Sequence, residues 1–272
     1  MATSRTIAGI DWATEPKNRA AVVLKIDCDT QRIVVDQVLS PLASTDITNL
    51  CKQRTISTVG IDIPFGWPRK FSEFVSDWTP TSGASTVCPA SLDYRYRTTD
   101  RFVHSRLGKW PLSVSSERFA LGTRLWCELY QKENLNGRID LIGNRPTGAP
   151  TIIEVYPAAT LAALSKGGLR LAIAGYKADE KIRRPLLKRV TETFGITFTG
   201  SLTLEQIVGS GKGSDMADAL IAALTAAVYD FDPALATGGN GATPLGGWRI
   251  CKPSEAQRAD ALKEGWIFFP TK

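Results

Sequence analysis

The sequence has little cysteine and almost no histidine, and this scarcity removes several kinds of functional site from consideration. His104 is the only histidine among 272 residues, so a histidine-rich metal site is excluded and a Ser-His-Asp triad would depend on that one side chain. The five cysteines are scattered without a CxxC pair: Cys28, Cys51, Cys88, Cys127 and Cys251. Such a pattern argues against a disulfide framework and against a zinc ribbon. It predicts a reducing cytoplasm as the compartment, and oxygen atoms as the ligands of any metal.

The sequence also lacks an apolar run long enough to span a membrane. The longest candidates, AGIDWA and LIAALTAAVY, are much shorter than the roughly 20 apolar residues that cross a bilayer. The first residues, MATSRTIAGID, lead into a strand-like segment without the apolar core of a signal peptide. We therefore expect no membrane partner and no secretory leader.

Acidic residues are scarcer than basic ones, and the formal net charge is +6. Two stretches concentrate the excess. Residues 94–124 hold seven basic and two acidic side chains, 7 − 2 = +5, and residues 177–189 hold six and two, 6 − 2 = +4. These stretches are either solvated helix faces or surfaces for an anionic partner such as nucleic acid.

The order of apolar segments predicts an α/β fold with a mixed sheet. Segments that read as strands are 5–11, 20–26, 32–39, 58–63 and 151–156. The first three are joined by short connections and predict an antiparallel meander, and a right-handed crossover then places the fourth strand beside the first. We expect five strands in the order 3-2-1-4-5, flanked by helices, with ligands binding at the carboxyl edge of the sheet. We expect one domain, residues 1–272, with a basic helical subdomain inserted after the fourth strand at about 65–150.

Two aspartates end strands that are expected to be neighbours. Asp11 ends the first strand and Asp62 ends the fourth. Aspartate is depleted in strands, and two carboxylates about 4.8 Å apart repel each other unless a cation lies between them. Oxygen-only ligation of this kind suits Mg²⁺ or Mn²⁺.

A second pair of acids opens the helical segment SDMADALIAAL. Asp215 and Asp218 are three residues apart and share one face of a helix, beside the apolar stripe. One interpretation is that they complete the metal site. The other is that Ser214 caps the helix and the acids only favour its dipole, which is a common arrangement in a first turn.

Four further charged residues are candidates with two interpretations each. Glu154 ends the fifth strand, and it is either an additional ligand and catalytic acid or the partner of an arginine. Arg95 and Arg97 could clamp a phosphate opposite the carboxylates, since arginine binds phosphate through two parallel hydrogen bonds. Arg97 and Asp100 could instead form a salt bridge within their loop.

The segments GIDWA, GIDIPFG, IIEVYPA and SDMADALIAAL, in this order, resemble the family called domain of unknown function 429. YRYRTTDR is similar to the arginine-plus-aspartate motif of that family, which is described as predicted nucleases of ribonuclease H-like fold. The carboxylate order is also similar to that of Holliday-junction resolvases, with 62 − 11 = 51 and 218 − 215 = 3. The sequence departs from the resolvases in having Asp62 where they carry glutamate, and in its long insertion. The resemblance implies a ribonuclease H-like fold with Asp11, Asp62, Asp215 and Asp218 as catalytic metal ligands.

Three functions are therefore considered. The first is a metal-dependent nuclease that cleaves DNA or RNA, with carboxylates holding two divalent ions about 4 Å apart. The second is a phosphotransferase or ATPase on the same fold core, but such proteins use a Gly/Thr-rich hairpin after the first acid, and WATEPKNR contains no glycine. The third is a catalytically inactive module that binds nucleic acid or a small ligand. The sequence leaves the oligomeric state open, a dimer included.

Overall fold

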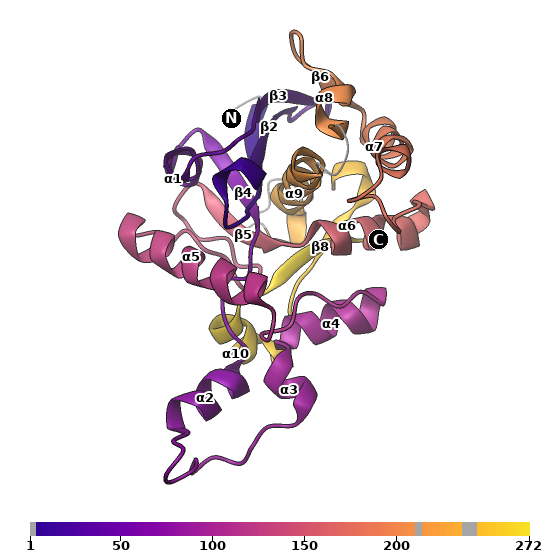
Figure 1. The fold of residues 1–272 in the computed structure, drawn as a ribbon. Coiled ribbons are helices and arrows are strands. Elements are labelled where there is room, and N and C mark those ends of the chain that lie inside the picture. The colour runs from indigo at the N-terminus through magenta and orange to yellow at the C-terminus, as the bar shows by residue number, and fades with distance from the viewer. Residues whose placement is uncertain (1–3, 210–213, 236–243) are drawn as a thin grey trace.

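The computed structural model describes residues 4–209, 214–235 and 244–272, and a mixed sheet forms its centre (Figure 1). In these residues the sheet has eight strands in the order β6-β3-β2-β1-β4-β5-β8-β7. The strands are β1 (Ser4–Asp11), β2 (Ala20–Asp27), β3 (Ile33–Leu39), β4 (Ile56–Asp62), β5 (Thr151–Val155), β6 (Ile196–Phe198), β7 (Arg249–Cys251) and β8 (Ile267–Thr271). The strands β1, β4, β5 and β8 run parallel, so their carboxyl ends share one edge.

The helices cover both faces of this sheet. They are α1 (Ser44–Lys52), α2 (Arg69–Asp77), α3 (Ser91–Arg95), α4 (Thr98–Leu107), α5 (Glu117–Glu133), α6 (Pro157–Leu164), α7 (Glu180–Phe194), α8 (Leu204–Val208), α9 (Asp215–Asp230) and α10 (Glu255–Glu264). One core cluster joins the sheet to α6, α7 and α9, and a second joins the opposite face to α1 and α5. No helix in the described ranges is long and apolar enough to cross a membrane.

The prediction of a mixed sheet flanked by helices is confirmed, but the prediction of five strands is wrong. The order 3-2-1-4-5 lies at the centre, and β6, β8 and β7 extend it. The strands β6 and β7 have only three residues each, too few to show a periodic pattern. The apolar segment near the end of the sequence forms β8, which pairs with both β5 and β7 and so lies inside the sheet.

Two glycines allow α9 to lie directly on the middle of the sheet. A Cβ atom at Gly9 would lie 2.0 Å from the backbone nitrogen of Ala223, and one at Gly60 would lie 2.8 Å from the carbonyl oxygen of Ala222. Gly9 and Gly60 are register partners in β1 and β4. Side chains two residues apart on a strand share a face, so the aspartates that follow each glycine by two positions also point to the α9 face.

The segment between β4 and β5 contains α2, α3, α4 and α5. In Figure 1 the helices α2 and α3 lie at the bottom of the view, away from the sheet, while α4 and α5 lie closer to it. The helix α10 packs against both α2 and α4. The insertion is therefore held to the body partly by elements from the end of the chain.

Candidate functional site

The two strand aspartates lie side by side at the carboxyl edge of the sheet. Asp11 and Asp62 are register partners at the ends of β1 and β4. Both residues are partly exposed to solvent. Burial raises the pKa of Asp62 to about 7, and the neighbouring Asp218 adds to this while Lys177 opposes it. Burial, followed by Asp218 and Asp62, also holds the pKa of Asp11 well above its usual range.

The first turn of α9 brings two more acids to the same place. Asp218 is only 1% exposed and Asp215 is half-buried one turn earlier. Burial and the charge of Asp218 raise the pKa of Asp215. Ser214 precedes the helix, but its side chain makes no capping hydrogen bond. The capping interpretation therefore lacks its main contact. We call Asp11, Asp62, Asp215 and Asp218 the acid site.

A lysine and a tyrosine from the loop before α7 contact the buried acid of α9. The Nζ atom of Lys177 lies 2.6 Å from Oδ2 of Asp218, and the hydroxyl of Tyr176 donates a hydrogen bond of 2.6 Å to Oδ1. Although burial disfavours the charged ammonium, Asp218, Asp62 and Asp11 raise the pKa of Lys177. Both oxygens of Asp218 thus have partners, and the ammonium is a cation within reach of three aspartates.

A buried arginine fixes this loop. Arg183, which is 0% exposed, donates hydrogen bonds to the carbonyl oxygens of Val208 at 2.6 Å, Tyr176 at 2.9 Å and Lys177 at 3.3 Å. The basic stretch 177–189 is therefore not simply a solvated face, because Lys177 contacts Asp218 and Arg183 holds the loop that carries Lys177.

Sequence reasoning missed three residues at this edge. Tyr176 and Lys177 lie far from the motifs in sequence, and only the local excess of positive charge indicated Lys177. Tyr156 directly follows β5, and burial together with Asp62 raises the pKa of its hydroxyl to about 12. The sequence offered a signal for Tyr156, because this residue belongs to the motif IIEVYPA and directly follows the strand that pairs with β4.

Three of the predicted residues form a separate buried cluster. The guanidinium of Arg97, 1% exposed, bonds to Oδ1 of Asp100 at 2.9 Å and to Glu154 at 2.6 and 2.9 Å. Although burial disfavours its charged form, both carboxylates raise the pKa of Arg97. Burial raises the pKa of Glu154, against the lowering effects of Arg97 and of the amide of Phe65. We call Arg97, Asp100 and Glu154 the arginine cluster.

This geometry favours the ion-pair interpretation of Arg97, Asp100 and Glu154 over the interpretation as substrate-binding residues and a ligand. All three side chains are buried and bonded to one another, so the ion-pair interpretation accounts for them. Arg95 is different, because it lies exposed at the end of α3 with its guanidinium 5.2 Å from the ring of Tyr96. No hydrogen bond or ion pair in the described part of the chain joins Arg95 to the acid site.

The acid site has the donor chemistry of a site for a hard divalent cation. Within the described ranges no group of three or more acidic, histidine or cysteine side chains is placed so that it could hold a metal ion. The four side chains of the acid site are nevertheless carboxylates, the ligand type that Mg²⁺ and Mn²⁺ prefer, and burial and mutual repulsion raise the pKa values of Asp11 and Asp62. Asp11, Asp62 and Asp218 would hold the ion, with Asp215 at the outer side.

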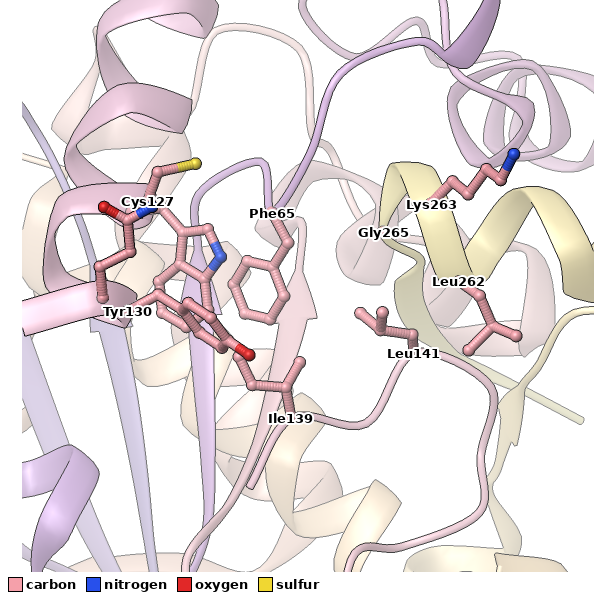
Figure 2. Close-up of a pocket in the computed structure, with 10 residues that line it drawn as sticks. Phe65, Cys127, Tyr130, Ile139, Leu141, Leu262, Lys263 and Gly265 are labelled. Atoms are coloured by element: carbon pink, nitrogen blue, oxygen red, sulfur yellow. The ribbon is translucent and has the colours of Figure 1, made fainter. Parts of the chain in front are cut away.

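A cavity of about 290 Å³ is lined by Phe65 and residues of α5 and α10 (Figure 2). None of the four aspartates lines it. Its wall is mixed, with the apolar side chains Ile139, Leu141 and Leu262 beside Gln131 and Lys263, and the ring of Phe65 stacks on Trp126 at 4.0 Å between centroids. The lack of acids in its wall separates this cavity from the chemistry of the acid site.

The chain belongs to the family described as protein of unknown function DUF429. The match covers residues 9–238, which include all four aspartates of the acid site and all of the arginine cluster. Comparison with curated proteins gave no match, and comparison with solved structures gave none either.

Proposed function

We propose that this protein is a metal-dependent nuclease of ribonuclease H-like fold that hydrolyses phosphodiester bonds of DNA or RNA. The observation that carries the proposal is the convergence of Asp11, Asp62 and Asp218 from two adjacent parallel strands and one helix. Divalent ions bound by such carboxylates supply an activated water and stabilise the leaving oxygen of a phosphodiester. This chemistry requires no histidine or cysteine nucleophile, which suits a chain with one histidine.

The arrangement of the sheet supports the same proposal. The central order β3-β2-β1-β4-β5, with an antiparallel meander followed by parallel strands, is the order expected of a ribonuclease H-like core. Exposed basic residues of the insertion, Arg95 among them, supply positive charge for a nucleic-acid backbone. A cytoplasmic location and nucleic acid as the partner belong to this proposal.

The test is a cleavage assay with Mg²⁺ or Mn²⁺ on single-stranded, duplex, hybrid and branched nucleic acids, with ATP hydrolysis measured in parallel. We expect metal-dependent cleavage that Asp62→Asn abolishes. Asp36→Asn is the matched control, because Asp36 is paired with Lys25 away from the acid site. Hydrolysis of ATP without cleavage would favour a phosphotransferase. Metal-independent nucleic-acid binding without cleavage would favour an inactive binding module.

A further inference from the structure

The acid site contains its own cation. Lys177 contacts Asp218 at 2.6 Å and also acts electrostatically on Asp62 and Asp11. The arginine of the neighbouring cluster is fully engaged by its own two carboxylates. The ammonium of Lys177 therefore supplies the positive charge that contacts Asp218, and Arg183 also acts electrostatically on Asp215.

The two partners of this ion pair differ in their freedom. Asp218 is 1% exposed and fixed on α9, whereas the side chain of Lys177 is 50% exposed. Four methylene groups separate the ammonium from its backbone, so it can leave the acid without any movement of the main chain.

The backbone beneath the lysine is held in place independently of that ion pair. Arg183 binds the carbonyl oxygens of Tyr176 and Lys177, and the amide of Asp179 donates to the carbonyl of Gly175 at 2.9 Å to close a turn. The side chain of Asp179 then accepts from the amide of Lys181 at the start of α7. The backbone of Lys177 is thus fixed while its half-exposed side chain can move.

A divalent ion bound by Asp218 and the ammonium of Lys177 would be close neighbours. Oδ1 of Asp218 accepts a hydrogen bond from Tyr176, and Oδ2 contacts Lys177, so an ion on either oxygen would lie near the ammonium. Two cations on one buried carboxylate repel each other strongly.

We propose that Lys177 holds the cation position of the acid site until a divalent ion displaces its ammonium, which then binds the phosphate of the substrate beside the acid site. The first half of this inference, the displacement of the ammonium by a metal ion, rests on the assignment of the metal ligands. The second half, the binding of the substrate phosphate, rests on the proposed function. It makes Lys177 both a competitor of the metal and a contact for the substrate, two roles with opposite consequences for a variant without the charge.

The first half is tested by titration of Mn²⁺ without substrate into the full-length protein and Lys177→Met, which keeps the apolar stem and removes the ammonium. Affinity for Mn²⁺ is expected to rise roughly tenfold or more, the scale on which one neighbouring charge alters cation binding at a carboxylate. Lys181→Met, an exposed lysine on α7, is the matched control and should leave the affinity unchanged. Lys177→Arg retains the charge and should stay within about threefold of the wild type.

Protein melting provides the readout if Lys177→Met is too unstable for calorimetry. The variant should melt lower than the wild type without metal, and Mn²⁺ should raise its melting temperature by more than it raises that of the wild type. Equal affinity and equal metal-induced shifts in wild type, Lys177→Met and Lys181→Met would overturn the role of Lys177 while leaving the metal site intact. Absence of Mn²⁺ binding in every protein would instead overturn the proposed function.

The second half is tested by binding of a short single-stranded DNA in the presence of a divalent ion under conditions without cleavage, or by KM where cleavage is seen. Lys177→Met should weaken binding of the DNA and reduce the slope of affinity against salt by about one unit, as expected for one lost phosphate contact. An unchanged slope would show that the displaced ammonium does not contact the substrate.

Discussion

Two groups of charged side chains lie at the carboxyl edge of the same sheet. The arginine cluster places two carboxylates around one guanidinium with at least four hydrogen bonds, and all its members are buried. The acid site places four carboxylates near one lysine, whose side chain is half exposed. Each group includes strand-end carboxylates, Glu154 near the end of β5 in the first and Asp11 and Asp62 at the ends of β1 and β4 in the second. The two groups thus differ in the ratio of acidic to basic side chains. The paired charges of the arginine cluster support the fold, whereas the excess of acids in the acid site is the basis for the proposed cation binding.

The energetic consequence follows from the cost of uncompensated buried charge. In the arginine cluster every charge has a partner, and removing one partner leaves a buried charge without compensation. In the acid site the repulsion among carboxylates already opposes folding, so removing one of them relieves strain. The comparison therefore predicts that substitutions of similar chemistry have opposite effects on stability in the two groups.

The largest effect is expected from breaking the arginine cluster. Arg97→Met leaves Asp100 and Glu154 buried without their cation, and it should lower the free energy of unfolding by about 3–5 kcal/mol. Urea denaturation measures this loss. Arg95→Met, the same change at an exposed position two residues earlier, should stay within about 0.5 kcal/mol of the wild type. Similar losses in both variants would remove the distinction between the two arginines.

The next effect comes from the contact that brings α9 onto the sheet. Gly9→Ala forces a methyl group into the backbone of α9 and should cost about 1–3 kcal/mol or more, and Gly60→Ala should cost less because its contacts are longer. Gly122→Ala is the control, since its added Cβ would meet Ile63 at an ordinary 3.5 Å and its helix favours alanine. Thermal unfolding of the three variants checks this order. A mild effect of Gly9→Ala would contradict the close approach of α9.

How far this comparison could be read from the sequence differs between the two groups. The sequence predicts Asp11 and Asp62 as neighbours, because both end strands and sheet topology joins those ends. It leaves Asp215 and Asp218 with two interpretations, and only the family resemblance implies that they join the same site. The arginine cluster was seen only as alternatives, since neither the burial of Arg97 nor its pairing with Glu154 follows from local spacing. Such contacts depend on how the insertion docks onto the body.

The remaining elements were missed for similar reasons. The loop carrying Lys177 reaches the acid site through long-range packing of Arg183 on Val208, and no sequence period encodes such a contact. The strands β6 and β7 are set by their partners β3 and β8 rather than by their own three residues. The position of this loop and the pairing of these two short strands both depend on contacts between distant parts of the chain.

The third prediction concerns pH. The pKa of Asp62 is raised to about 7 in the folded protein, above the value of about 3.9 for an unfolded aspartate. The folded state therefore holds this proton more tightly, so its contribution to stability is greatest below pH 4 and is lost as the pH rises towards 7. The free energy of unfolding should fall by up to about 1.4 kcal/mol per pH unit in this window without divalent ions.

Denaturation with urea at pH 4 to 8 measures this dependence. Asp62→Asn should flatten it and should be as stable as the wild type or more stable near pH 7. Mn²⁺ should also flatten it, because the cation favours the charged carboxylates. A stability that rises through this window in the wild type, and equally in Asp62→Asn, would show that the acid site does not carry the strain assigned to it.

The smallest effect is expected at the outer acid of α9. Asp215→Asn removes a favourable interaction with the helix dipole but also relieves some repulsion from Asp218, so the net cost should not exceed about 0.3–1 kcal/mol. Asp218→Asn should alter metal binding more, because Asp218 is buried and directly contacted by Lys177 and Tyr176. Melting of both variants with and without Mn²⁺ separates the two. A larger loss of the metal effect in Asp215→Asn would reverse their assigned roles.

The most direct test of the central claim, that the acid site binds a divalent cation, is calorimetric titration of Mn²⁺ into the wild type, Asp62→Asn and Asp36→Asn. The account predicts saturable binding in the wild type, the same binding in Asp36→Asn, and at least a tenfold loss of affinity in Asp62→Asn, the scale expected when a carboxylate ligand is removed. Equal affinity in all three proteins would contradict the account, because the cation would then bind somewhere other than the ends of β1 and β4.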